Sequence, residues 1–394
     1  MTSVATTLAG LRAVTREVDP LEDALDALGP DGFAWIGGGH TLVTSGVAAV
    51  VPAELATETL FEIDADDDLA LPGAGPIAVG ALPFAPHAPA TMVVPATVVG
   101  VAPDCRTWVT RIGPRAVPVP PPTALPTRYT VRAVQGRAWW DRAVAGALAA
   151  IAEHGIEKVV LAREVTVDAD TDLDVRTVVR RLRAQQPGCF VYAEGGFVGA
   201  TPELLVRRRG RAIESRPMAG TAPGSVAEDV ARTLAASNKD AREHRFVVDA
   251  VHDVLTPLTT SLEVPEHPEV EHFGNLAHLV TPIRGELTDP GLDALSLARL
   301  LHPSPAVGGT PTDAALRVID ELEPFDRGPY AGPVGWVDAR GDGEFAVALR
   351  GAQIDGAHAL LRAGAGIVAG SDPEAEWLET AAKFEPMLRA LVVP

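Results

Sequence analysis

The stretch Gly364–Met387 restricts the fold most, because it joins an apolar, glycine-containing run directly to a helix start. The run LLRAGAGIVAG has the length and composition of a buried strand. After it, Ser371 is the expected helix cap, Pro373 suits the first turn, and Glu374 completes a capping box with Ser371. The pattern predicts a buried strand followed at once by a helix that runs from Pro373 to about Val392.

One face of this expected helix carries acidic and basic side chains together. Glu376, Glu379 and Lys383 stand at i, i+3 and i+7, so at roughly 100° per residue they fall within about 60° of one another. Two carboxylates a turn apart beside a cation, next to a glycine-rich turn, suit a divalent metal and an anionic ligand. A solvated helix face with a Glu379–Lys383 ion pair is the simpler interpretation of the spacing alone.

The composition limits the possible partners. Of 394 residues, 47% are hydrophobic and 22% are charged, which argues against bulk disorder. The net charge of −19 disfavours nucleic acid or an anionic membrane as a partner. Any anion site must therefore be built locally from Arg, Lys, backbone N–H groups or a metal.

Cysteine usage and hydropathy indicate the compartment. Cys105 and Cys189 lack CxxC or Cys/His ligand spacing, so we expect two free thiols. The sequence shows neither a signal-peptide core nor an apolar span of 18 residues. We therefore expect a cytoplasmic protein.

Strand clusters alternate with helices, which predicts an α+β architecture with a sheet layer in the middle. Residues 1–130 form an antiparallel-rich N-terminal part with short strands and a hairpin turn at Gly37–Gly39. Residues 131–394 form a second part, and the proline-rich segment Val117–Thr127 before it is expected to run extended. The expected helices lie at Asp19–Gly32, Arg137–Gly155, Val175–Gln186, Ser225–Leu258, Leu292–Leu300, Thr312–Leu322 and the C-terminal helix.

Charged residues inside apolar strands are the first candidates for chemistry. Lys158, in EKVVLARE, either extends its ammonium to water or is held in a pocket with a lowered pKa, where it can act as a base. Glu203, in GATPELL, is expected in a strand, where apolar neighbours favour the protonated form that a general acid needs; an edge-strand glutamate facing water is the alternative. Arg350, in the strand ALRGAQI, is costly unless paired, so Arg350 and Tyr330 suit a carboxylate ligand.

Further candidates lie in a turn, a helix and a strand. Gly220 and Thr221 either present N–H and hydroxyl groups to an anion or form an ordinary turn. Glu243 interrupts an apolar helix face as a possible metal ligand, although a surface glutamate is the simpler interpretation. His278 stands in the apolar run HLV, where a satisfied buried histidine is the simpler interpretation.

These motifs together resemble the chorismate-utilising enzyme family. EKVVLARE, GATPELL, the AGT turn, KDAREH, HLVT, HPSPAVGG, the YAGPVGW to LRGAQ run, and GAGIV followed by EWLETAAK appear in the family's order. The resemblance covers roughly residues 137–394. It implies a single large α/β sandwich with two pseudo-duplicated subdomains around a central cleft, in which residues 131–394 form the chorismate-binding catalytic region.

The resemblance also implies roles for individual residues. Glu243 and Glu379 would bind Mg²⁺, with Glu376 beside it directly or through water, and the metal would hold the ring carboxylate of chorismate. Lys158 would activate water at ring C2, and Glu203 would protonate the departing C4 hydroxyl. The implied substrate-binding groups are Thr221, His278, Tyr330, Arg350, Lys383 and the backbone N–H groups of Gly364, Ala365 and Gly366.

Lys158 and Ala219 distinguish branches of the family. The anthranilate branch has glutamine at the position of Lys158, and water, unlike ammonia, needs a base. The aminodeoxychorismate branch has lysine where this chain has Ala219. The resemblance therefore implies an isochorismate synthase serving menaquinone or a catechol siderophore, a monomer with no glutaminase partner. A salicylate synthase, an anthranilate-type component and a catalytically silent chorismate-binding homologue stay open as alternatives.

Four further positions concern the product and the pocket. Ala306 and Val307 stand in the HPSPAVGG loop where salicylate-forming relatives tend to carry a Thr-Ala pair, which favours isochorismate as the product. Tyr330 is usual in the salicylate branch, although menaquinone-type isochorismate synthases also carry it. Gly351 follows Arg350 where serine, cysteine or alanine is more usual, so the pocket volume there stays open.

Overall fold

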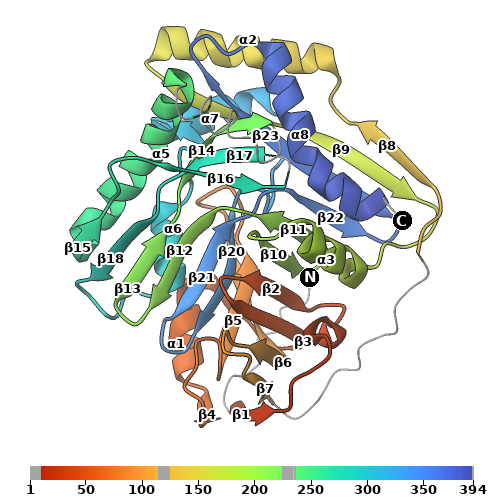
Figure 1. Cartoon of the computed structure of the whole chain (residues 1–394), viewed down its shortest axis with the longest axis vertical. Helices are drawn as coiled ribbons and strands as arrows, with labels where there is room; N and C mark the ends of the chain where they lie inside the picture. Colours follow the sequence, from red (N-terminus) through yellow and green to blue (C-terminus); the bar gives the residue numbers. More distant parts are fainter. Residues whose placement is uncertain (1–9, 114–124, 224–233, 235–236, 275, 393–394) are drawn as a thin grey trace.

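The computed structural model describes residues 10–113, 125–223, 234, 237–274 and 276–392. The elements of the N-terminal third gather at the lower end of the molecule in Figure 1. They are β1 (Arg12–Val18), β2 (Phe33–Gly37), β3 (His40–Pro52), α1 (Ala56–Phe61), β4 (Asp64–Asp67), β5 (Ile77–Ala81), β6 (Thr91–Val101) and β7 (Thr107–Ile112), with 3-10 turns at Ala24–Ala27 and Ala53–Leu55.

Helices alternate with strands through the remaining two thirds of the chain. The first half of this region comprises β8 (Tyr129–Ala133), α2 (Arg137–His154), β9 (Lys158–Ala169), α3 (Val175–Gln185), β10 (Phe190–Glu194), β11 (Phe197–Thr201), β12 (Leu204–Arg209), β13 (Ala212–Ser215), β14 (Met218–Pro223) and α5 (Asn238–Leu255). The second half comprises a 3-10 turn (Thr256–Leu258), β15 (Thr259–Glu263), β16 (Glu269–Phe273), β17 (Leu276–Val280), β18 (Ile283–Leu287), α6 (Ala294–Leu301), β19 (Gly309–Thr310), α7 (Thr312–Leu322), β20 (Pro333–Asp338), β21 (Gly343–Val347), β22 (Gly351–Asp355), β23 (His358–Val368) and α8 (Pro373–Val392).

Several local predictions are confirmed. β2 and β3 form the expected hairpin, and Gly38 and Gly39 turn it with φ of 59° and 84°, values that glycine adopts without strain. The left-handed Gly155 follows α2 as a C-cap. Most of the predicted extended segment Val117–Thr127, and the first part of the predicted helix Ser225–Leu258, lie outside the described residues.

The long central ladder joins β9 to β23. The two strands pair antiparallel from Lys158–Val368 to Asp168–His358. The predicted boundary near residue 130 falls within β8, which pairs with β9. Strands from both parts share this sheet, because β2 pairs with β10 and β5 pairs with β20. The two predicted parts are therefore joined by continuous hydrogen bonding.

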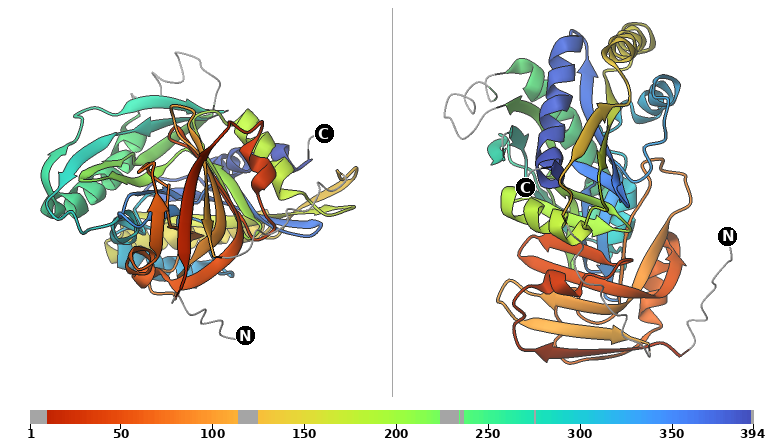
Figure 2. Two further views of the ribbon diagram at one scale, coloured as in Figure 1. Left: turned by 90° about the horizontal axis from the view of Figure 1, so that it is seen from below. Right: turned by 90° about the vertical axis from the view of Figure 1, so that its right-hand side faces the viewer.

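A second, smaller sheet and several helices complete the layers. β14, β17 and β16 form a three-stranded sheet beside α5. In Figure 2, α8 and α2 lie near β9 and β23 at the end away from the N-terminal strands. The C-terminal half of α8 buries Phe384 and Met387 in a core shared with Leu361 and Ala363 of β23. Among the described residues, no helix combines the length and apolarity needed to cross a membrane.

Two predictions of strand position are wrong, those for Glu203 and Arg350. Glu203 lies in the break between β11 and β12, not in a strand, because Pro202 has no N–H to donate to a sheet ladder. Arg350 lies in the break between β21 and β22 and has a left-handed φ of 51°. Both charged side chains are therefore presented from strand ends.

The cap of α8 also differs from the prediction. The carboxylate of Asp372, not the hydroxyl of Ser371, accepts a hydrogen bond from the N–H of Ala375 at 2.9 Å. Ser371 Oγ accepts from the N–H of Val368 at 3.2 Å and so closes the preceding turn. The predicted start of the helix at Pro373 is confirmed.

Candidate active site

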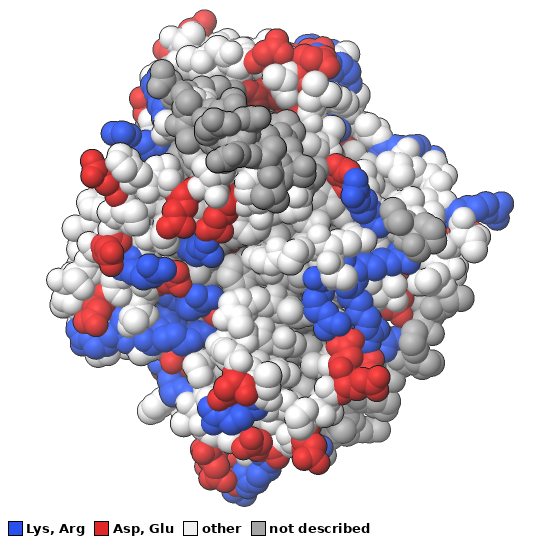
Figure 3. Space-filling model, viewed as in Figure 1, with Lys and Arg blue, Asp and Glu red and all other residues white. Residues whose placement is uncertain are grey.

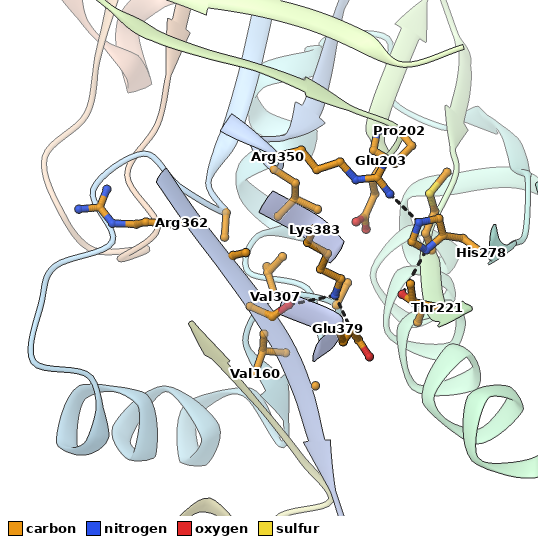
Figure 4. A pocket seen from close by; sticks show the side chains of 18 of the residues that line it. Val160, Pro202, Glu203, Thr221, His278, Val307, Arg350, Arg362, Glu379 and Lys383 are labelled. Carbon is orange, nitrogen blue, oxygen red and sulfur yellow. Dashed lines mark hydrogen bonds and ion pairs between the residues drawn. The ribbon is translucent and has the colours of Figure 1, made fainter. Parts of the chain in front are cut away.

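A pocket of roughly 790 Å³, counting its open mouth, lies among β14, β17, β23 and α8 (Figure 4). Most of the predicted site residues line it, although they come from distant parts of the chain. They are Glu203, Thr221, Glu243, His278, Tyr330, Arg350, Gly364, Gly366, Glu379 and Lys383. The lining does not include Lys158, Ala365 or Glu376.

His278 and Arg350 form the centre of one wall. A guanidinium N–H of Arg350 donates to Nε2 of His278 at 2.6 Å, so Nε2 is an acceptor. Nδ1 then carries the proton and donates to the carbonyl of Gly220 at 3.2 Å, with Thr221 Oγ1 at 3.3 Å. Burial, followed by the charges of Arg350 and Lys383, holds the pKa of His278 well below its usual value. His278 is therefore neutral.

Arg350 is arranged to receive an anion. It is buried, and its second terminal nitrogen, Nη1, has no hydrogen-bond partner among the described residues. Burial lowers its pKa, while Cys189 and Glu203 oppose that effect, and a guanidinium keeps its charge in proteins. A buried, incompletely paired guanidinium suits a carboxylate ligand.

Glu203 has the protonation state of an acid. Its side chain is 4% exposed, and burial raises its pKa from 4.5 to about 8. Lys158, a hydrogen bond from the Met218 backbone, Lys383 and Arg350 each oppose this shift without cancelling it. Near neutral pH the carboxyl group therefore mostly keeps its proton. Figure 4 shows it pointing into the pocket below Pro202.

Lys383 lies across the pocket and stays charged. Its Nζ donates to Glu379 Oε1 at 2.7 Å and to the carbonyl of Gly364 at 2.9 Å. Burial lowers its pKa, but Glu379 and more distant acidic groups outweigh burial and raise it. The predicted Glu379–Lys383 pair is confirmed, and it faces the pocket, not bulk solvent.

Lys158 lies behind the pocket lining and contacts it through Glu243. Its side chain is 1% exposed, and Nζ lies 2.8 Å from Glu243 Oε1. A Cβ at Gly366 would lie 2.7 Å from Glu243 Oε1 and 2.8 Å from Lys158 Cε. Only glycine therefore leaves room for this ion pair beside β23. Ala365 is buried on the other face of the strand, as the pleat requires.

Two of the three predicted metal ligands are placed where they could bind Mg²⁺. Glu243 and Glu379 line the same pocket, and Mg²⁺ commonly takes one or two carboxylates and completes its shell with water and substrate oxygens. Glu376 is 2% exposed and lies outside the lining. The described residues contain no group of three or more His, Cys, Asp or Glu side chains arranged around one metal position.

Two arginines of the pocket were missed by sequence reasoning. Arg327 is paired with Glu323 through contacts of 2.6 and 2.8 Å and donates to the carbonyl of Val307 at 2.8 Å. Arg362 is paired with Glu164 at 2.9 Å. Arg362 stands in the apolar run HALLRAGAG, so the criterion that selected Arg350 also applied to it.

Comparisons with known proteins agree with this geometry. Residues 115–392 match the family model described as chorismate binding enzyme. The chain therefore belongs to the family of chorismate-binding enzymes, as the motifs predicted.

Individual relatives are more specific. The chain is 41% identical to isochorismate synthase DhbC of Bacillus subtilis over 280 residues. This alignment covers 67% of this chain and 70% of that protein. The chain is 37% identical over 324 residues to isochorismate synthase EntC of Escherichia coli, with 79% and 80% covered. The structure of MenF, the menaquinone-specific isochorismate synthase from Escherichia coli, matches with a TM-score of 0.84 and 27% identity over 97% of this chain and 95% of that one. The predicted family and fold class are confirmed.

Proposed function

We propose that this chain is a Mg²⁺-dependent isochorismate synthase that converts chorismate to isochorismate. The observation that carries the proposal is that a protonated, buried Glu203 and the Lys158–Glu243 pair meet at one pocket whose walls also present Arg350 and Lys383. This combination supplies an acid, a candidate base and cationic groups for a substrate with two carboxylates. The names of the relatives above support the same activity.

Substrate binding is assigned to the cationic and hydroxyl groups of the pocket. Arg350, Tyr330 and Lys383 hold the enolpyruvyl carboxylate. Burial raises the pKa of Tyr330, so its hydroxyl stays neutral and can donate a hydrogen bond. His278 and Thr221 lie near the ring carboxylate. Glu243 and Glu379 would hold Mg²⁺, whose charge would neutralise and orient that ring carboxylate.

Two residues move the protons. Lys158 acts as the base in its neutral amine form, after its ammonium has given up a proton and left the pair with Glu243; the amine then accepts a proton from a water molecule as the water oxygen forms a bond to ring C2. Glu203 donates its proton to the C4 hydroxyl, which leaves as water while the ring double bond shifts. One hydroxyl is gained and one is lost, so the overall reaction is an isomerisation that needs no redox partner.

The alternatives identified from the sequence are less well supported. Lysine at position 158 favours water over ammonia, so we expect no glutaminase partner. Ala306 and Val307 line the pocket, and we expect release of isochorismate without elimination of pyruvate. We also propose that the protein is a monomer and that it is cytoplasmic. One of the relatives named above is a menaquinone-specific enzyme.

Product identification tests the proposal. The purified protein is incubated with chorismate and Mg²⁺ near neutral pH without ammonia, and the products are separated by chromatography. We expect an equilibrium mixture of chorismate and isochorismate, with no more pyruvate than in the control without enzyme. Accumulation of salicylate and pyruvate in step with chorismate loss would assign a salicylate synthase instead. Recovery of unchanged chorismate would identify a silent homologue.

A further inference from the structure

A buried arginine lies behind the pocket and takes no part in the mechanism above. Arg163, in β9, is 3% exposed, and no described carboxylate lies within ion-pair distance of it. Burial lowers the pKa of its guanidinium to about 10. Burying an unpaired charge is costly, and an apolar side chain of similar length would fill the space without that cost. The position of this arginine therefore needs an explanation.

The guanidinium of Arg163 contacts three residues of the helix α8. Its central carbon lies 3.6 Å from the ring centroid of Trp377 and 4.9 Å from that of Phe384. Its Nε donates to Thr380 Oγ1 at 2.7 Å, and Thr380 is fully buried. Stacking on aromatic faces and a directional hydrogen bond are interactions that a planar guanidinium makes together.

These contacts define the rotation of α8 about its own axis. Trp377, Thr380 and Phe384 stand at i, i+3 and i+7 and so share one face. Glu379 and Lys383 directly precede two of them, so their side chains project roughly 100° away around the helix. Glu379 and Lys383 are the residues that α8 contributes to the pocket lining. A rotation of the helix would move both at once.

The two ends of α8 have separate anchors. The indole N–H of Trp140 donates to the carbonyl of Pro373 at 3.1 Å and holds the first turn. Met387 and Leu391 pack in the core near the C-terminal end. The contact with Thr380 lies between these anchors, next to Glu379.

We propose that Arg163 is a positioning residue for the active site: its contacts with Trp377, Thr380 and Phe384 set the rotation of α8 and hence the placement of Glu379 and Lys383. The inference rests on the proposed function for its kinetic and metal-binding consequences. Its structural consequence, the order of α8 in the ligand-free protein, is independent of that function.

The test compares Arg163→Met, which keeps apolar volume, and Arg163→Lys, which keeps charge but loses the planar group, with Arg132→Met as control. Arg132 lies on the neighbouring strand β8, is 66% exposed and pairs with Asp168. Three quantities are measured: amide hydrogen exchange across 376–384 without ligand, the Mg²⁺ concentration that gives half the maximal rise in melting temperature, and the KM and kcat for chorismate.

For Arg163→Met we expect faster exchange across 376–384, a Mg²⁺ midpoint raised about tenfold or more, and a KM raised more than kcat is lowered. Arg163→Lys should show smaller changes in the same direction, and Arg132→Met should match the wild type. A folded Arg163→Met protein with wild-type exchange, Mg²⁺ midpoint and KM would overturn the inference, even with a lower melting temperature. If Arg163→Met does not fold, Arg163→Lys decides by the same comparison.

The outcomes separate the two proposals. A wild-type protein that makes no isochorismate contradicts the proposed function, and the exchange measurement then decides the inference about Arg163. A wild-type protein that makes isochorismate, beside an Arg163→Met protein of unchanged exchange and metal response, contradicts the inference alone.

Discussion

Arg350 donates a hydrogen bond to Nε2 of His278 across 2.6 Å, so a buried cation is hydrogen-bonded to a neutral imidazole in the wall of the pocket. His278 in turn is held by the carbonyl of Gly220. The guanidinium is thereby fixed in direction while its other terminal nitrogen, Nη1, stays available for a ligand. We propose that the two residues act together in binding an anion.

Replacing His278 should weaken substrate binding through Arg350. A hydrogen bond to a charged group contributes about 1.5–3 kcal/mol, so His278→Ala should raise the KM for chorismate by about tenfold to a hundredfold. Thr221→Val removes the 3.3 Å contact to Nδ1 and a hydroxyl of the pocket, but it leaves the hydrogen bond between Arg350 and His278 in place, so we expect a smaller rise in KM. Steady-state kinetics of both variants provide the measurement, and an unchanged KM in His278→Ala would contradict the role of this pair.

The pH dependence of the reaction should follow Glu203. Because its pKa is raised to about 8, the acid is available below that pH, and kcat/KM should fall as the pH rises through about 8. Glu203→Gln should lose about a hundredfold or more in rate and should lack this limb. A pH–rate profile of the two proteins is the measurement. A wild-type rate that stays constant to pH 10 would exclude Glu203 as the acid.

Glu203 should also affect folding stability with a defined sign. Its pKa is higher in the folded protein than the value of 4.5 expected when unfolded, so the folded state binds more protons between those values. The stabilising contribution is therefore complete below about pH 4.5 and is lost as the pH rises to about 8. Urea unfolding should show wild type losing stability relative to Glu203→Gln across this window, and a constant difference would contradict the burial argument.

Lys158→Gln should lose addition of water while the protein stays folded. The amide cannot accept the proton of the attacking water, so we expect a rate loss of about a hundredfold or more. Glutamine is also the residue of the ammonia-using branch, so the variant should be assayed with and without ammonium. Near-normal formation of isochorismate by this variant would require another base.

The carboxylates Glu243 and Glu379 should be needed for metal-dependent turnover. Alanine at either position should abolish activity at ordinary Mg²⁺ concentrations without unfolding the protein, and Mg²⁺ should raise the melting temperature of wild type but of neither alanine variant. Glu385→Ala is the matched control, because Glu385 lies on the same helix in an exposed pair with Arg389. Full wild-type activity in EDTA would contradict the metal assignment.

Replacing Gly351 by a residue with a side chain should destabilise the protein. A Cβ there would lie 2.6 Å from Tyr192 Oη and 2.9 Å from the carbonyl of Val198, so Gly351→Ala should cost about 1–3 kcal/mol. Tyr192→Phe removes the first contact, so the double variant should lose less stability than the sum of the single variants. Urea denaturation measures this coupling, and strict additivity would show that the two side chains do not compete for space.

Tyr192 also answers a question that the sequence left open. The sequence left open whether the missing side chain at Gly351 enlarges the pocket. The structure shows that the buried Tyr192 side chain occupies the space beside Gly351. Its hydroxyl donates to the carbonyl of Leu349 at 3.1 Å. Residue 351 has no side chain, and its partner is 159 positions earlier, so local sequence could not reveal the contact.

The charges on the surface also depend on the folded chain. Figure 3 shows acidic and basic side chains in mixed groups on the face it presents, with Lys and Arg beside Asp and Glu. Ion pairs also join distant parts of the chain: Arg180 lies 2.9 Å from Asp23. The net charge of −19 predicted only that an anion site had to be local, and we propose that Arg350 and Lys383, which both line the pocket, form it.

Sequence alone determined the features that depend on local chemistry. The spacing of apolar residues, glycine stops and proline starts predicted the helices α2, α7 and α8 and the strands β9 and β23. Motif order identified the family, and the i, i+4 spacing predicted the Glu379–Lys383 pair. These features follow from periodicity and backbone preference, which act over a few residues.

The tertiary structure alone decided what each charged group does. Burial, which depends on every element packed around a residue, keeps Glu203 protonated, makes His278 neutral and leaves Arg350 short of partners. The breaks that present Glu203 and Arg350 arise where paired strands end, so their position depends on the whole sheet. Contacts such as Lys158 with Glu243 and Arg163 with α8 join residues more than 80 positions apart. Long-range packing of this kind leaves no periodic pattern in the sequence, because either partner alone is compatible with many environments.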